Sequence, residues 1–238
     1  MQKSIIVENL SKNYFNKEAV KQISFTINEN EILGLLGPNG CGKTTTIAMM
    51  LGLLEPTKGK VIIHGQDIEK NRISLLHKMN FISPYIELPK KLTVKENLIV
   101  YGKLYGVKLI SERIKYLSEK LRLNEFINTK TGELSSGQKN RVSLAKALIN
   151  EPSVLFLDEP TASLDPETSI FIRNFLMEFK KENKSSILIT SHNLEEIKNM
   201  CSELILLKSG KIVNKGNIHK LLKENDSGSI MDFFLKRG

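Results

Sequence analysis

One glycine-rich stretch of the sequence has the spacing of a phosphate-binding loop. GPNGCGKTT, residues 37–45, follows an apolar strand pattern and opens a helical one. Its three glycines, Gly37, Gly40 and Gly42, let the backbone come close to a phosphate chain and turn its N–H groups inward. A glycine-rich turn with a solvated lysine is the alternative, but the strand before and the helix after favour phosphate binding.

The end of this loop supplies side chains that a nucleoside triphosphate needs. Lys43 is predicted to reach the β- and γ-phosphates, Thr44 to offer its hydroxyl to Mg²⁺, and Thr45 to lie near the α-phosphate. Cys41 lies beside a helix N-terminus and Lys43, and such surroundings lower a thiol pKa and raise its reactivity. A small residue that only fills the loop is the other interpretation of Cys41.

Two carboxylates end an apolar strand pattern in SVLFLDEP, residues 153–160. A buried strand would deliver Asp158 and Glu159 to the carboxyl edge of a sheet, where ligands of α/β folds bind. Asp158 suits the shell of a Mg²⁺ ion, and Glu159 suits the polarisation of an attacking water. An acidic strand end that caps the next turn is the structural alternative.

A second candidate anion site begins a helix in GELSSGQKNR, residues 132–141. Free backbone N–H groups and the positive end of the helix dipole would point at a ligand there. Ser135 followed by Gln138 is also a capping box, which starts a helix with or without a ligand. Both roles are compatible with the same residues.

The elements that must position these residues alternate between short apolar strands and helical patterns. The strands are predicted at 4–8, 23–27, 31–36, 60–64, 79–82, 153–157, 186–190 and 203–208, the last joined by Ser209-Gly210 to a hairpin partner at 211–216. The helices are predicted at 43–53, 95–106, 111–122, 136–149, 166–182, 193–200 and 217–224. The segment from about 84 to 150 is almost all helical, which predicts a helical subdomain inserted into a mostly parallel sheet.

Composition sets the broad class. The 238 residues suit one large α/β domain or a domain with a sizeable insertion. The longest apolar runs are far too short for a membrane helix, and the N-terminus is too polar for a signal peptide, so we expect a cytosolic chain. The two cysteines give no disulfide framework. The net charge of +9 is spread as single lysines and short pairs, which favours solvated helix faces over a nucleic-acid patch or attraction to an anionic membrane.

In their order along the chain, these motifs resemble those of the nucleotide-binding subunits of ABC (ATP-binding cassette) transporters. The loop resembles Walker A, LFLDEP resembles Walker B, and LSSGQ at 134–138 resembles the signature motif, with Ser136 in place of a glycine. Further matches are the D-loop in SLD (Ser163, Leu164 and Asp165), the switch histidine in TSH (His192), and the aromatic residue that stacks on adenine (Tyr14). The resemblance covers nearly the whole chain.

Some of these residues have ordinary structural alternatives. Asp165 followed by Pro166 forms a helix N-cap with proline at the first helical position. His192 could be a loop histidine with satisfied hydrogen bonds, and Tyr14 could pack against the sheet.

The resemblance implies the fold and the partners. It implies an α/β, RecA-like P-loop fold with a mostly parallel sheet core, an N-terminal antiparallel β region and an inserted α-helical subdomain. The single ABC ATPase domain would span 1–238, with its core at 1–83 and 151–216, the helical subdomain with the signature motif at 84–150, and a helical tail at 217–238. Two such subunits, as a homodimer or a heterodimer, would meet head to tail around ATP.

The resemblance also assigns the site. The ATP-binding residues would be Tyr14, Gly37, Pro38, Asn39, Gly40, Cys41, Gly42, Lys43, Thr44 and Thr45, with Mg²⁺ held by Thr44 and Asp158. The residues that contact the partner's nucleotide would be Ser135, Ser136, Gly137 and Gln138, and the catalytic ones Glu159 and His192. One chain thus carries two half-sites that face different nucleotides, which explains why it has two anion-binding motifs.

The sequence departs from the family pattern at one position. The family normally places a glutamine at the junction of core and helical subdomain, and Pro84 stands there, beside Ser83. Proline has no side-chain ligand for a metal. The departure therefore predicts either that Ser83 or a backbone carbonyl substitutes for the glutamine or that coupling is altered and basal hydrolysis is slow.

The expected function is ATP hydrolysis that drives transport, of exporter type, through separate integral membrane permease subunits on whose cytoplasmic face the chain would lie. The alternatives are a soluble ABC ATPase acting on nucleic acid or ribosomes, for which the chain lacks a second cassette and a long insertion, and a slow ATP-gated dimerisation module.

Overall fold

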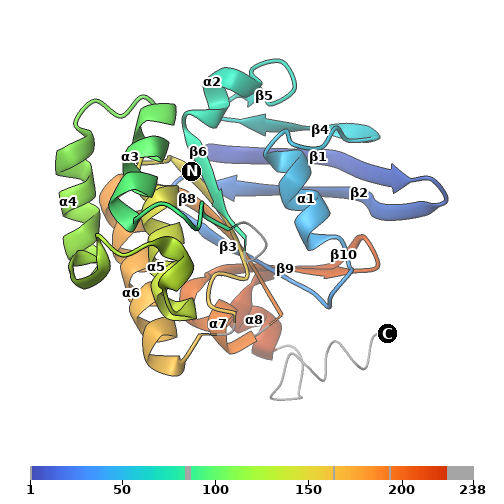
Figure 1. Cartoon of the computed structure of the whole chain (residues 1–238). Coiled ribbons are helices and arrows are strands. Elements are labelled where there is room, and N and C mark those ends of the chain that lie inside the picture. Colours follow the sequence, from blue (N-terminus) through green and yellow to red (C-terminus); the bar gives the residue numbers. More distant parts are fainter. Residues whose placement is uncertain (1, 84–86, 163, 193, 224–238) are drawn as a thin grey trace. The chain divides into compact units, whose positions relative to one another are not determined.

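The computed structural model describes residues 2–83, 87–162, 164–192 and 194–223 (Figure 1). Pro84 at the junction and Ser163 of the D-loop therefore lie outside the described residues, as does most of the expected tail at 217–238. The chain divides into two compact units. The first unit comprises residues 1–75 and 186–238, and the second comprises residues 76–185.

The first unit contains an antiparallel sheet in the strand order β2-β1-β4-β5. Its strands are β1 (Lys3–Tyr14), β2 (Lys17–Asn28), β4 (Lys58–Ile63) and β5 (Gln66–Asp67). Alternation of apolar and polar residues sets the buried face, where Val7 pairs with both Phe25 and Val61. β1 and β2 are longer than the sequence predicted because their bulged, partly polar ends still pair with one another.

A second sheet of this unit carries the phosphate loop. β3 (Ile32–Leu36) pairs in parallel with β8 (Ser186–Ser191) and with β9 (Glu203–Lys208), and β9 forms an antiparallel hairpin with β10 (Lys211–Asn217). Every residue of β3 and β8 is buried. β3 is apolar throughout, as expected of a strand buried on both faces, whereas β8 carries Ser186, Thr190 and Ser191 around its apolar centre. The helices of this unit include α1 (Lys43–Met50), α7 (Leu194–Met200) and α8 (Ile218–Lys223).

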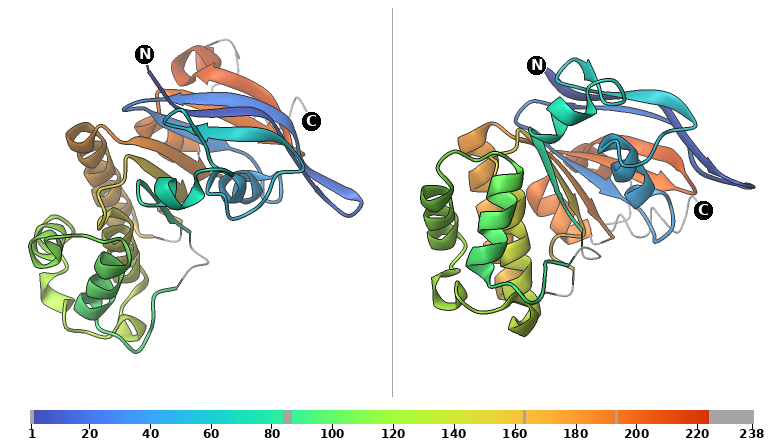
Figure 2. Two further views of the ribbon diagram at one scale, coloured as in Figure 1. Left: turned by 90° about the horizontal axis from the view of Figure 1, so that it is seen from above. Right: turned by 45° about the horizontal axis from the view of Figure 1, so that its top comes forward.

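The second unit combines two parallel strands with helices (Figure 2). β6 (Met79–Ile82) pairs with β7 (Val154–Asp158), in a register that places Met79 opposite Val154. The α-helices are α3 (Val94–Leu104), α4 (Ile110–Lys120), α5 (Ser136–Leu148) and α6 (Pro166–Asn183), and single 3-10 turns lie at Asn124–Phe126 and Thr131–Glu133. The first three α-helices pack against one another around Leu98, Leu117 and Leu144, all buried.

The predicted α/β class is confirmed, with an N-terminal antiparallel sheet, parallel core strands and a helical segment. The predicted strands at 79–82 and 203–208 match β6 and β9 residue for residue. The sequence did not predict β5 or the short helix α2 (Arg72–Leu76). The helical subdomain at 84–150 stays a prediction, since the compact unit that contains these helices also includes β6 and β7. Among the described residues, no helix combines the length and apolar character that crossing a bilayer requires.

Candidate nucleotide-binding site

The phosphate loop runs from the buried end of β3 to the start of α1, and its glycines have distinct jobs. A Cβ at Gly37 would collide with the Leu207 carbonyl oxygen and the Cys41 sulfur. Gly40 and Gly42 have φ values of +77° and +111°, in the left-handed region that glycine adopts at no steric cost. A Cβ at Gly42 would also lie 2.7 Å from the Ala19 carbonyl oxygen. The loop therefore needs glycine for close packing at one position and for backbone conformation at the others.

The outer side of this loop is open to solvent. Pro38, Asn39 and Gly40 are exposed, as is Thr44 in the first turn of α1. Lys43 is buried, and its ammonium donates to the Gly37 carbonyl oxygen at 2.6 Å and to that of Pro38 at 3.4 Å. The Lys43 ammonium is thus hydrogen-bonded to the start of the loop. Its charge lies beside the exposed backbone that would receive a phosphate.

Residues far along the chain hold the loop in place. The Gly210 N–H donates to the Cys41 carbonyl oxygen at 3.0 Å, and the Gly210 carbonyl accepts from the Lys21 N–H at 2.8 Å. Inside α1, the Thr46 hydroxyl donates to the Gly42 carbonyl oxygen at 2.8 Å. The β9–β10 turn therefore connects β2 to the phosphate loop, a role that the sequence analysis had not assigned to Gly210.

Of the two interpretations of Cys41, the structure favours the space-filling residue over the reactive thiol. The side chain is 3% exposed, and burial raises the pKa of the Cys41 thiol above its ordinary value. The nearby charge of Lys43 acts in the opposite direction but is the smaller effect. Desolvation has the larger effect on the pKa because the thiol is packed under the loop. The structure therefore supports the interpretation of Cys41 as a small residue that fills space.

Tyr14 and His192 are the other candidate ligands in the first unit. Tyr14 ends β1 with 43% of its surface exposed, and the Lys12 ammonium lies 5.6 Å from the centre of its ring. His192 follows β8 directly, and its side chain is exposed. Both side chains are accessible to a ligand. Sequence reasoning missed Phe15, which is fully exposed at φ +47° in the β1–β2 turn.

In the second unit, β7 brings the two carboxylates to its end. Asp158 is 3% exposed, and Glu159 is partly exposed at φ +52°. A positive φ is costly for a residue with a Cβ, so surrounding contacts must hold it. The Ala162 N–H donates to the Glu159 carbonyl oxygen at 3.1 Å and closes the turn. This turn directs the Glu159 side chain differently from a continued strand.

The signature residues begin α5 with a complete capping box. The Ser135 hydroxyl accepts from the Gln138 N–H at 3.2 Å, and the Gln138 side-chain oxygen accepts from the Ser135 N–H at 2.9 Å. Ser135 and Ser136 are exposed, and Gly137 and Gln138 are partly exposed. The cap satisfies some N–H groups of the first turn and leaves the helix end accessible.

The D-loop residues lead into α6. Asp165 is its N-cap, and its carboxylate accepts from the Thr168 N–H at 2.9 Å, with Pro166 at the first helical position. Hydrogen bonds from Thr168 lower the pKa of the Asp165 carboxyl. Leu164 is partly buried. The structural role predicted for Asp165 is confirmed.

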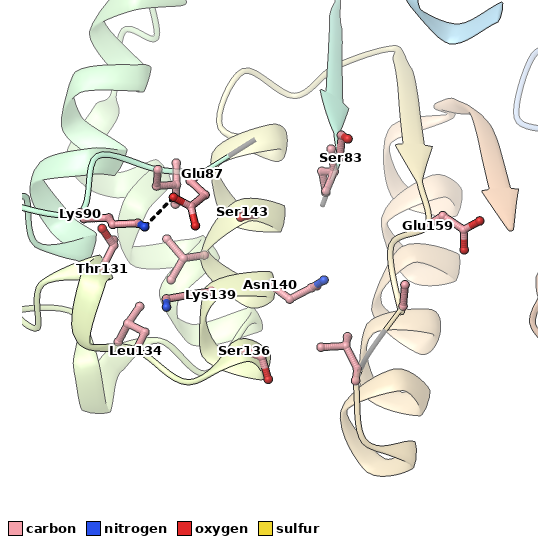
Figure 3. Close-up of a pocket in the computed structure, with 15 residues that line it drawn as sticks. Ser83, Glu87, Lys90, Thr131, Leu134, Ser136, Lys139, Asn140, Ser143 and Glu159 are labelled. Carbon is pink, nitrogen blue, oxygen red and sulfur yellow. Dashed lines mark ion pairs between the residues drawn. The ribbon is translucent and has the colours of Figure 1, made fainter. Parts of the chain in front are cut away.

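A cavity of about 230 Å³ within the second unit joins several of these residues (Figure 3). Ser136 of the signature motif, Glu159 and Leu164 all line it. Other lining residues had no predicted role: Glu87, Lys90, Lys139, Asn140 and Ser143. Glu87 and Lys90 form an ion pair of 2.7 Å at this cavity. The spacing of Ser136, Lys139, Asn140 and Ser143 by three and four residues was the sequence signal for one helix face.

A sequence profile described as ABC transporter matches residues 20–162. The ABC transporter ATP-binding protein NatA of Bacillus subtilis is 34% identical over 92% of this chain and 90% of its own length. The Nod factor export ATP-binding protein I of Rhizobium johnstonii is 37% identical over 97% of this chain and 75% of its own length.

Solved structures agree. An ATP-binding subunit of an ABC transporter superimposes with a TM-score of 0.88 at 25% identity, covering 98% of both chains. The cassette MJ0796, as a post-hydrolysis dimer bound to ADP and Pi, gives 0.82 at 25% identity over 90% of this chain and 98% of that one. CbiO1 of Clostridium perfringens, part of the ABC transporter complex cbiONQ, gives 0.84 at 28% identity over 99% of this chain and 96% of that one.

These matches define the class of protein: the chain belongs to the ABC transporter family. Within it, the chain is an ATP-binding subunit, the ATPase component of such a transporter.

Proposed function

We propose that this chain hydrolyses ATP to power export through separate membrane-spanning subunits. The observation that carries the proposal is the ordered set of nucleotide motifs on an ABC cassette fold. The direction of transport rests on a relative, since the Rhizobium protein that is 37% identical is an export ATP-binding protein. The cargo would be chosen by the membrane subunits.

The first step is the binding of ATP by the phosphate loop. The exposed backbone of residues 38–40 and the start of α1 offer N–H groups and a helix dipole to the phosphates. Lys43 would exchange its bond to the Gly37 carbonyl for a charged one to the β- and γ-phosphates. Tyr14, accessible at the end of β1, would stack on adenine.

The donor set also suits Mg²⁺. Thr44 is an exposed residue with a hydroxyl oxygen, and Asp158 is a nearly buried residue with a carboxylate at a strand end. Mg²⁺ prefers such oxygen ligands and usually completes its shell with phosphates and waters. When bound, the ion would offset the charge of the transferred phosphoryl group.

Hydrolysis would depend on two polar side chains. Glu159 would polarise and aim the attacking water, because its carboxylate is held on a turn at the end of β7. His192, exposed directly after β8, would contact the γ-phosphate and respond to its loss. Both side chains would raise the rate of hydrolysis to the extent that their interactions are stronger in the transition state than in the ground state.

The partner of the nucleotide-bound chain would be a second ABC ATPase, identical or related. The signature residues 135–138 would close on the ATP bound to the partner subunit, and Leu164 and Asp165 of the D-loop would lie at that interface. A C2 arrangement repeats every such contact twice, so ATP would join the subunits until hydrolysis. The MJ0796 cassette, similar in fold, is a dimer bound to ADP and Pi.

The remaining partners would be integral membrane permease subunits, with the chain bound at the cytoplasmic face of the membrane. CbiO1, similar over nearly the full length, is part of a transporter complex. Nucleic acid is not an expected partner, and the relatives do not favour the alternative of an ATPase that acts on nucleic acid or ribosomes.

The decisive test is Glu159→Gln, which keeps the size of the side chain and removes its charge. We expect ATP binding to persist and turnover to fall by about 100-fold or more, since a positioned general base contributes that much. A stable ATP-dependent dimer should then appear on gel filtration. Parent-level hydrolysis by this variant would contradict the assignment.

A further inference from the structure

The turn that presents Glu159 carries unusual backbone constraints. Glu159 has a φ of +52°, and the next residue is a proline, which disfavours the α region for the residue before it. Pro160 also has no N–H, so it can accept but not donate a backbone hydrogen bond. A turn of this kind persists only where neighbouring groups hold it.

One side chain outside the turn bonds to its backbone. The Asn140 amide donates to the Pro160 carbonyl oxygen at 2.8 Å, across 20 residues of sequence. Pro160 is buried and Asn140 is partly buried, so water competes little for this bond. Figure 3 shows Asn140 projecting from α5 toward the side of the cavity on which Glu159 lies.

The position of Asn140 on α5 connects this bond to the signature motif. Asn140 lies four residues after Ser136, so the two side chains share one face of the helix, and both line the cavity with Glu159. The capping box fixes the first turn of α5, so the helix end and Asn140 form one stiff segment. A displacement of the α5 N-terminus would therefore move Asn140 and alter its hydrogen bond to the Pro160 carbonyl oxygen.

We propose that Asn140 is a positioning residue for hydrolysis: its amide holds the Pro160 carbonyl and so aims the Glu159 carboxylate from the helix that begins with the signature motif. This inference rests on the proposed role of Glu159 as the group that polarises water. A displaced carboxylate would still leave the phosphate loop intact. The bond therefore affects the rate of the chemical step and leaves nucleotide binding unchanged.

The test uses the full-length protein with three substitutions. Asn140→Leu has a similar volume and no donor, Asn140→Gln keeps the amide on a longer side chain, and Ser143→Ala is the matched control on the same cavity wall. We expect Asn140→Leu to lower kcat about tenfold or more, because small misplacements of reacting groups cost that much, with KM for ATP changed less than about twofold. Asn140→Gln should recover part of kcat, and Ser143→Ala should match the parent.

A double substitution separates positioning from general damage. In a Glu159→Gln background, Asn140→Leu should cause no further loss in single-turnover hydrolysis, because it acts through a carboxylate that is already gone. A parent-level kcat for Asn140→Leu, or the same fold-loss with and without Glu159, overturns the inference. If Glu159→Gln is inactive while Asn140→Leu is normal, only the inference fails. If Glu159→Gln keeps parent turnover, both the proposed catalytic role of Glu159 and the inference about Asn140 fail.

Discussion

At the scale of the residue, Lys43 is the proposed positive charge that binds the phosphates of ATP at the phosphate loop. Its ammonium lies 2.6 Å from the Gly37 carbonyl oxygen, so it is held beside the exposed backbone of the loop. We expect Lys43→Ala to weaken ATP binding about tenfold or more, since charge-assisted bonds contribute more than neutral ones. Equilibrium binding of a fluorescent ATP analogue measures this. Lys58→Ala, an exposed lysine of β4, is the control, and equal affinities for the two variants would contradict the role.

Cys41 allows a second test at this scale. Because burial raises the pKa of its thiol, little thiolate exists at neutral pH, and access to the sulfur is restricted. In a Cys201→Ser variant, native protein should react with maleimide much more slowly than unfolded protein, and the rate should rise as the pH increases toward the raised pKa. Mass spectrometry of timed samples measures the labelling. Rapid labelling of the native protein at pH 7 would restore the idea of a reactive loop thiol.

At the scale of the element, two helices begin with the same chemistry. Thr93 and Glu96 form a capping box on α3, as Ser135 and Gln138 do on α5. The α3 cap has no proposed ligand, whereas the α5 cap is part of the signature motif. The pair therefore separates the structural role of a cap from its role in binding.

We expect Thr93→Ala and Ser135→Ala to lower the free energy of unfolding by a similar amount, about 1 kcal/mol each, because each removes one N-cap. Only Ser135→Ala should also reduce ATP-dependent dimer formation and ATP turnover. Chemical denaturation and ATPase assays on the same preparations measure both effects. An equal loss of turnover in the two variants would indicate that the α5 cap matters only for stability.

At the scale of the whole molecule, we expect the proposed coupling of hydrolysis to a membrane partner to depend on the sequence junction at Ser83 and Pro84. No glutamine occurs between Gln66 and Gln138, so the amide that the family places there is missing from this stretch. The proposed ligands of the triphosphate and metal, which are Lys43, Thr44 and Asp158, are all present in the sequence. We therefore predict near-normal ATP affinity with slow basal turnover, since alignment of the water matters most in the transition state.

Pro84→Gln should raise kcat more than it changes KM, and it should alter the stimulation given by the membrane partner. The measurement is ATPase activity of parent and variant, each with and without co-purified membrane subunits. If the parent is already as fast as glutamine-bearing relatives and the variant gains nothing, then Ser83 or the backbone fills the role. A slow parent that dimerises around ATP would favour the alternative of an ATP-gated dimerisation module.

The sequence by itself determined the features that depend on near neighbours. The capping box at Ser135 closes within one helical turn, and the glycines of the phosphate loop fix its backbone within a few residues. Apolar runs located the buried strands β3 and β7 because the apolar residues themselves make that burial favourable. Interactions between residues that are close in the sequence can therefore be predicted from the sequence alone.

Only the tertiary structure decided the features that depend on contacts between residues far apart in the sequence. The pKa direction of Cys41 depends on burial under the loop, where Leu207 and Gly210 approach from far along the chain. The short strand β5 exists because it pairs with β4, and the Asn140 bond to Pro160 spans 20 residues. Desolvation and long-range hydrogen bonds arise from packing, and no spacing in the sequence specifies which distant groups will meet.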